Sequence, residues 1–254
     1  MDYRIEKLDG HTWLIEEYDA VTSVYMYLLE GTQKALLIDT GMGQIALDEI
    51  VRGLTGLPVE VLNTHGHLDH IGGNGLFDRV HMSRLEQGVY GLHSSEELWK
   101  KHAAYPMPKM RDNVDWFDGE PTLDLGGRLL EIILTPGHTL GSVCVLDVER
   151  RWLFTGDTCC KASVLLMLDY CTRVEEYRQS VEKLWRRRSD YTLTWPAHHT
   201  KPVVPEILVQ FQEACDQLLE QKQEGVPQTT GFGESYIYRY QDVAIEYDKA
   251  RLRG

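Results

Sequence analysis

The stretch "NTHGHLDHIGGN", residues 63–74, decides how the rest of this 254-residue chain is interpreted. Three histidines and one aspartate fall within the six positions from His65 to His70, directly after an apolar run and directly before a glycine pair. A soluble chain seldom concentrates so much imidazole and carboxylate on one short loop, so this stretch needs a chemical explanation.

The spacing within this loop predicts a shared face of side chains. In extended backbone alternate side chains share a face, so His65, His67 and Asp69 can point the same way. His70 is out of phase and joins them only if the backbone turns, and the glycine pair at 72–73 gives freedom for a tight turn into a helix.

A divalent cation explains why these groups stand together. Packed imidazoles repel one another when protonated, and an isolated buried carboxylate is costly. A cation binds neutral imidazole and ionised carboxylate, and so removes both problems. A single histidine in such a loop is more commonly a hydrogen-bonded loop residue, but the four groups together favour a metal site.

Further candidate ligands follow three later strands, each at a strand-to-loop junction. They are His138 in "LTPGHTLGS", Asp157 in "LFTGDT", and His198 or His199 in "TWPAHHT". An isolated histidine or aspartate at a strand end more often caps a turn. A catalytic metal site needs ligands from several segments, so their recurrence after the "HGHLDH" loop indicates convergence on one site.

With these motifs the chain resembles the metallo-β-lactamase superfamily, from Ser23 to about His199. The resemblance implies an α/β (α+β) fold, a four-layer αββα sandwich with metal ions at the sheet edges. It also implies seven metal ligands: His65, His67 and His138 for a first ion, Asp69, His70 and His198 for a second, and Asp157 as the bridging carboxylate. The resemblance also implies a catalytic role for Asp69, which would orient the attacking hydroxide.

Two further positions are read through the same resemblance. His199 competes with His198, and His198 is preferred because it follows a small residue, Ala197, where the family more often has glycine. Asp39 in "LIDTGMG" matches a position whose aspartate orients the metal loop, the alternative being an Asx turn before Gly41.

The implied chemistry is hydrolysis. In such a site two divalent ions, Zn²⁺ with iron or manganese as alternatives, would lie ~3.5–4 Å apart and could supply a shared hydroxide to attack a small ester, thioester or lactone. Asp157 stands where true metallo-β-lactamases of the main zinc class carry cysteine, which disfavours antibiotic hydrolysis. Thioester hydrolases of the hydroxyacylglutathione type carry aspartate there and resemble "TPGHTLGS" and "FTGDT".

Other classes stay open. Acyl-homoserine lactonases share the ligand set, but they place a tyrosine a few residues past the bridging aspartate, where Cys160 stands in this chain. Persulfide dioxygenases resemble the same motifs and use one iron. A non-catalytic metal-binding relative is a third alternative, which the full ligand set disfavours.

Composition limits the partners. The formal charge of −13 argues against a nucleic-acid partner, and no apolar run approaches the ~20 residues that span a bilayer. The start "MDYRIEKLDG" shows no secretory signal, and five irregularly spaced cysteines do not form a disulfide framework. We therefore expect a cytoplasmic enzyme of small molecules, with a homodimer left open.

Hydrophobic patterning predicts one domain over residues 1–254, with an inserted cap or surface loop at about 83–118 that holds the candidate substrate-contact residues. These candidates are His81 just before the insertion, and His93, His102, Tyr105 and Trp116 within it. Strands are expected at 12–17, 23–30, 34–39, 59–63, 128–135, 142–148, 151–157 and 191–195, and helices at 44–54, 174–188 and 205–225, the last ended by Gly225. The tail around 234–247 is expected to add an edge strand or pack as an arm.

Overall fold

The computed structural model describes residues 1–102, 104–231 and 233–253. Its contacts divide the chain into two compact units, Met1–Ile132 and Ile133–Gly254. The assignment of the whole chain to a single domain stays a prediction.

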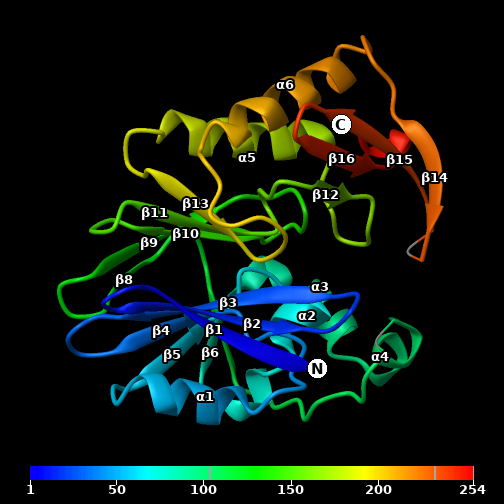
Figure 1. The fold of residues 1–254 in the computed structure, drawn as a ribbon. Helices are drawn as coiled ribbons and strands as arrows, with labels where there is room; N and C mark the ends of the chain where they lie inside the picture. The colour runs from blue at the N-terminus through cyan, green and yellow to red at the C-terminus, as the bar shows by residue number, and fades with distance from the viewer. Residues whose placement is uncertain (103, 232, 254) are drawn as a thin grey trace. The chain divides into compact units, whose positions relative to one another are not determined.

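A seven-stranded mixed sheet forms the framework of the first unit, with its strands in chain order (Figure 1). The neighbouring pairs from β1 to β4 are antiparallel, and the pairs from β4 to β7 are parallel. The strands are β1 (Asp2–Asp9), β2 (Thr12–Tyr18), β3 (Ser23–Glu30), β4 (Ala35–Ile38), β5 (Val59–Leu62), β6 (Val80–Ser83) and β7 (Val114–Phe117).

Helix α1 (Leu47–Leu54) covers one face of this sheet, where Leu47 and Val51 join a cluster with Met26 and Leu37 (Figure 1). The near-continuous apolar runs of β3 and β4 are buried throughout their centres, as expected of strands covered on both faces. The helix expected at 44–54 is confirmed, but it begins at Leu47. Its first expected residue, Gln44, instead donates its backbone N–H to the Glu17 carboxylate at 2.8 Å.

Short helical segments connect the last strands of this sheet. They are α2 (Leu68–Ile71), η1 (Asn74–Leu76), η2 (Arg84–Glu86), α3 (Gln87–His93) and α4 (Glu96–His102). The stretch 83–118 is thus partly helical, but it ends in β7, a strand of the sheet itself. Trp99 is buried and donates Nε1–H to the His93 carbonyl at 2.7 Å, so this aromatic residue packs. The capping role of the stretch stays a prediction.

A five-stranded sheet has the order β13-β11-β10-β9-β8. Its strands are β8 (Thr122–Asp124), β9 (Leu129–Leu134), β10 (Val143–Asp147), β11 (Trp152–Gly156) and β13 (Leu193–Pro196). The strands expected at 128–135, 142–148, 151–157 and 191–195 are confirmed within two residues at each end. Three of these strands, β9, β11 and β13, are followed by the candidate ligands His138, Asp157 and His198.

A four-stranded sheet in the second unit has the order β12-β16-β15-β14. Its strands are β12 (Ser163–Leu166), β14 (Val226–Thr230), β15 (Gly233–Tyr240) and β16 (Val243–Tyr247), and the 3-10 turn η3 (Lys249–Arg251) follows. The tail predicted as an edge strand or arm therefore supplies two strands that are paired with each other and with their neighbours.

Helices α5 (Val174–Arg186) and α6 (Ile207–Leu219) run side by side in this unit, and α6 lies against β15 and β16 (Figure 1). The prediction that Gly225 ends the helix expected at 205–225 is wrong, because that helix, α6, ends at Leu219. Gly225 lies just before β14, and its N–H donates to the Tyr247 hydroxyl at 3.0 Å.

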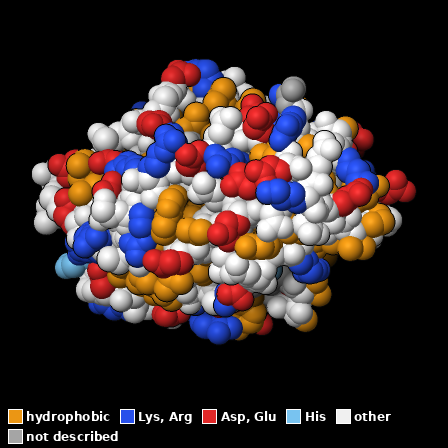
Figure 2. Space-filling model, turned by 90° about the horizontal axis from the view of Figure 1, so that it is seen from above, with side chains coloured by type: hydrophobic (Ala, Val, Ile, Leu, Met, Phe, Trp, Pro, Cys, Tyr) orange, Lys and Arg blue, Asp and Glu red, His pale blue; other side chains and the backbone are white. Residues whose placement is uncertain are grey.

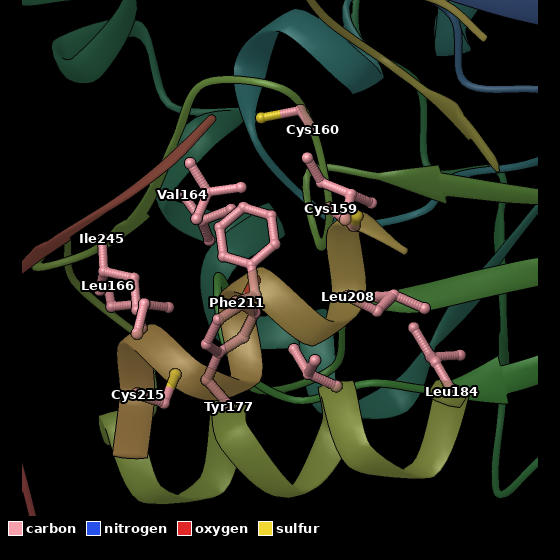
Figure 3. Packing of buried hydrophobic residues seen from close by; sticks show 14 of the residues in the cluster. Cys159, Cys160, Val164, Leu166, Tyr177, Leu184, Leu208, Phe211, Cys215 and Ile245 are labelled. Carbon is pink, nitrogen blue, oxygen red and sulfur yellow. The ribbon is translucent and has the colours of Figure 1, made fainter. Parts of the chain in front are cut away.

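The core of the second unit lies around these helices (Figure 3). Tyr177 and Phe211 meet edge to face with ring centroids 5.9 Å apart. Cys159 and Cys160 belong to the same buried cluster, and burial raises the pKa of the Cys160 thiol to about 12. Because the thiolate is the reactive form, these cysteines are packing groups, as the sequence predicted.

None of the helices in the described ranges combines the length and apolar character needed to cross a bilayer. On the face drawn in Figure 2, acidic and basic side chains are interspersed among apolar ones.

We expect Phe211→Ala to lower the free energy of unfolding by about 3–5 kcal/mol, because it opens a cavity in a packed core. Chemical denaturation measures this change. Gln179→Ala on α5 is the control, since Gln179 is exposed and should shift stability little. Equal effects of the two substitutions would contradict the packing described for α5 and α6.

Candidate metal centre

The first half of the candidate centre is the loop that follows β5. The backbone remains extended at His67, and α2 begins at the next residue, with the His70 N–H donating to the His67 carbonyl at 2.9 Å. The predicted alternation therefore holds only from His65 to His67. A single helical turn, rather than extended chain, carries Asp69 and His70.

This turn packs the three imidazoles together in the interior of the first unit. The ring centroids of His65 lie 4.6 Å from those of His67 and 4.0 Å from those of His70, and all three rings are buried. His65 Nε2 and His67 Nδ1 are 3.1 Å apart. The Asp69 carboxylate is 3.7 Å from His70 Nε2, so four donors gather as predicted.

Asp39 orients this group from behind. Its carboxylate is buried, accepts the N–H of Thr64 at 2.7 Å and its hydroxyl at 2.8 Å, and lies 2.9 Å from His70 Nδ1. A carboxylate at Nδ1 places the proton there and leaves Nε2 with a lone pair for a cation. Asp39 therefore does more than form an Asx turn, which was the alternative that the sequence left open.

The glycines of the loop are needed for close approach rather than for unusual dihedral angles. Gly72 has φ of −57°, yet a Cβ there would lie 2.3 Å from the Met42 carbonyl carbon. At Gly66 a Cβ would lie 2.8 Å from the Tyr90 nitrogen. Both positions exclude a side chain because another backbone segment occupies the space.

Glu86 is an anchor that the sequence did not reveal. Its carboxylate is fully buried and accepts the Gly66 N–H at 2.7 Å, in the middle of the histidine motif. Asn63 adds a second anchor, donating Nδ2–H to the His70 carbonyl at 2.8 Å. Because these contacts bind backbone on both sides of the ligands, they fix the loop itself.

The second half of the candidate centre lies in the second unit, where Asp157 stands between two histidines. His138 Nε2 is 3.4 Å from one carboxylate oxygen of Asp157, and His198 Nε2 is 3.5 Å from the other. The structure thus brings together the three residues that the sequence placed after β9, β11 and β13.

His138 is held in one orientation by backbone groups. Its Nδ1 lies 2.9 Å from the Leu165 carbonyl, which requires the proton on Nδ1 and leaves Nε2 facing Asp157. The Cys171 thiol donates to the His138 carbonyl at 2.9 Å. The proton is therefore held on Nδ1 in both units. The Leu165 carbonyl holds it at His138 in the second unit, and the Asp39 carboxylate holds it at His70 in the first.

His198, rather than His199, is the histidine that faces Asp157. The side chain of His198 is largely buried, whereas His199 is exposed and has a backbone φ of +67°. The geometry within this unit agrees with the preference drawn from Ala197.

Among the candidates named around the insertion, His93 touches the metal loop. Its ring centroid is 4.4 Å from that of His67, and its Nδ1 accepts the Leu68 N–H at 3.2 Å. His93 thus supports the first turn of α2.

The other candidates are paired with residues that are not part of that loop. Tyr105 donates its hydroxyl to Asp19, and Trp116 packs edge to face on Tyr90 with centroids 5.6 Å apart. His81 Nε2 lies 3.4 Å from the Glu60 carboxylate. The side chain of His102 lies outside the described residues.

Comparison with known proteins identifies the family of the chain. The model of the "Metallo-beta-lactamase superfamily" matches residues 19–196. The chain belongs to this superfamily.

Individual relatives are hydrolases. The chain is 30% identical over 204 residues to a human protein named "Acyl-coenzyme A thioesterase MBLAC2", covering 69% of this chain and 72% of that one. It is 27% identical over 189 residues to BaeB of Bacillus velezensis, a "probable polyketide biosynthesis zinc-dependent hydrolase", covering 72% and 76%. A metallo-β-lactamase from Pontibacter korlensis superposes with a TM-score of 0.64 at 20% identity, over 84% of this chain and 98% of that structure. The predicted α/β metallo-β-lactamase fold is confirmed.

The donor chemistry of both halves fits a divalent metal such as zinc, which binds imidazole nitrogen and carboxylate oxygen. Ligand atoms of His65 and His67 lie within 4.8 Å of each other, as do those of Asp69 and His70. The use of a metal by this protein follows from the donor set and from its family.

We expect Asp39→Asn to weaken metal affinity about 10–100-fold, because the amide can no longer hold the His70 Nδ1 proton with a full negative charge. Competition with a chromogenic chelator measures this loss. Asp48→Asn is the control, because Asp48 pairs with Arg52 at the surface and should leave affinity unchanged. Wild-type affinity in Asp39→Asn would contradict the orienting role.

Proposed function

We propose that the protein is a dinuclear metal-dependent hydrolase of small thioesters. The observation that carries this proposal is the pair of complete half-sites: one of His65, His67, Asp69 and His70, the other of His138, Asp157 and His198. We infer that the seven residues jointly hold two ions, with Asp157 bridging them.

When bound, two such ions lower the pKa of a shared water toward ~7 and polarise a substrate carbonyl oxygen. The chain's own residues hold the ligand nitrogens in the correct tautomer, through Asp39 at His70 and the Leu165 carbonyl at His138. Asp69 is 28% exposed while His70 is buried, so its carboxylate has room to orient the attacking water and accept its proton.

A thioester is the favoured substrate for two reasons. The most similar relatives include an acyl-coenzyme A thioesterase, at 30% identity over most of both chains. The second reason is the resemblance at Asp157, because thioester hydrolases of the hydroxyacylglutathione type carry aspartate at this position. Buried Cys159 and Cys160 stay protonated, because burial raises their pKa, so neither competes as a nucleophile.

A relative supports zinc as the metal, and the cysteines support a reducing compartment such as the cytoplasm. BaeB is named a zinc-dependent hydrolase, and the ligands proposed here are those that zinc accepts. The five cysteines are free thiols, which suits a reducing compartment.

We expect two zinc ions per chain by elemental analysis, and hydrolysis of an acyl-coenzyme A detected by release of free thiol. Chelation should abolish this hydrolysis, and added Zn²⁺ should restore it, because the nucleophile depends on the ions. One iron per chain with oxygen uptake on a persulfide would instead identify a dioxygenase.

We expect Asp157→Ala or His67→Ala to lose bound metal and to lower kcat/KM on the order of 100-fold or more, because each removes a proposed ligand. Metal content and thiol release are measured on the same preparation, with circular dichroism as the test of folding. His199→Ala is the matched control for His198→Ala, since His198 Nε2 lies 3.5 Å from the Asp157 carboxylate and His199 is exposed. Greater loss in His199→Ala than in His198→Ala would reverse the ligand assignment.

A further inference from the structure

A pocket of about 380 Å³ lies within the second unit, formed by three segments that are distant in sequence. Leu140 comes from the loop after His138, residues 170–176 come from the connection into α5, and Arg251 comes from η3. None of its lining residues is one of the seven proposed metal ligands.

Two arginines give this pocket a positive character. Arg251 donates one N–H to the Leu168 carbonyl at 2.7 Å, and the Arg173 side chain is exposed. Within the described ranges, neither guanidinium is paired with a carboxylate. Each guanidinium carries five N–H donors in a planar fork, so most donors of this pair remain available to a ligand.

One carboxylate also lines the pocket, but it is already engaged. Glu176 accepts the backbone N–H of Arg173 at 3.0 Å, which caps the start of α5. The lining charges are therefore two positive against one negative. In a chain of net charge −13, such a local excess of positive charge is what an anion needs to approach.

The remaining wall is apolar and partly exposed. Leu140 and Tyr170 are 44% and 47% exposed, and Tyr170 has a backbone φ of +64°, which is uncommon for a bulky side chain. A ligand with an anionic end and a less polar body fits a pocket with these two kinds of wall.

The pocket is fastened directly to the half-site of the second unit. The thiol of Cys171, a lining residue, donates to the His138 carbonyl at 2.9 Å, and the Thr172 N–H donates to the Gly137 carbonyl at 2.9 Å. A molecule held in the pocket is thus placed beside the segment that presents His138.

We propose that this pocket binds the anionic end of the thiol carrier of the substrate, a phosphate or a carboxylate, through Arg173 and Arg251. The proposal rests on the thioester hydrolysis proposed above and extends it to the part of the substrate that leaves as the thiol. An acyl chain is a poorer occupant, because it offers the guanidinium groups no acceptor and would desolvate them at a cost.

Binding to metal-free protein tests the pocket without any reaction. Desulfo-coenzyme A carries phosphates and no thiol, and S-methylglutathione carries carboxylates, so calorimetric titration with each distinguishes the two sources of anion. We expect one of them to bind, with a dissociation constant that rises about tenfold in Arg173→Ala and in Arg251→Ala and that also rises with salt. Binding of neither probe, or equal binding by wild type and both variants, would overturn the proposal.

Kinetics on metal-loaded enzyme provides the second measurement. Two thioesters of the same acyl group are compared, one with the carrier that binds in the titration and one with neutral N-acetylcysteamine. The kcat/KM of the carrier thioester, divided by that of the N-acetylcysteamine thioester, should fall about tenfold in each variant. An unchanged ratio would overturn the carrier pocket while the hydrolase function stands. If wild type hydrolyses no thioester, the proposed function fails, and the titration still decides whether the pocket binds anions.

Matched variants separate charge from folding. Arg186→Ala is the control. Arg186 is exposed at the end of α5, the helix that Arg173 precedes, and it pairs with Glu182 outside the pocket. Arg251 also holds the Leu168 carbonyl, so Arg251→Lys, which keeps the charge, should retain more binding than Arg251→Ala. Should Arg251→Ala fail to fold, Arg173→Glu carries the test, and wild-type binding in that variant would overturn the assignment.

Discussion

The constraint on which the first unit depends is the packing of three imidazoles in its interior. Buried rings that approach one another this closely are stable only when they are neutral and each nitrogen has a defined partner. The fold meets that demand with Asp39 behind His70 and with Glu86 on the Gly66 backbone. Because these acids are buried as well, they and the loop stabilise each other, and a bound cation would satisfy the nitrogen lone pairs that remain.

The second unit meets the same demand with fewer charges. A backbone carbonyl at Leu165 fixes the proton of His138, and Asp157 faces His138 and His198 from a strand end. A neutral acceptor orients the ring without adding a second negative charge near Asp157. The negative charge of this half is therefore concentrated on one carboxylate, Asp157, which is consistent with the bridging role proposed for it.

Sequence predicts these features unevenly, and the difference has a physical reason. The strands and the histidine motif are legible because apolar alternation and ligand spacing are local properties. The helical turn at Asp69, the need for Gly72 and the role of Glu86 depend on segments that meet only in three dimensions, so no local pattern reports them. The wrong helix end at Gly225 has the same origin, because Gly225 is used by the Tyr247 hydroxyl and not by α6.

The pocket lined by Arg173 and Arg251 is connected to His138. This connection bears on how substrate specificity can change without loss of hydrolytic activity. Cys171 contacts both the His138 carbonyl and the Leu165 carbonyl that fixes the imidazole, so a pocket wall that shifted would disturb a proposed ligand. The arginines avoid this coupling, because Arg173 precedes α5 and Arg251 lies in η3, and among the described residues no hydrogen bond or ion pair joins either guanidinium to a proposed ligand. Charge at these two positions can therefore vary to suit a carrier while the geometry around His138 is kept.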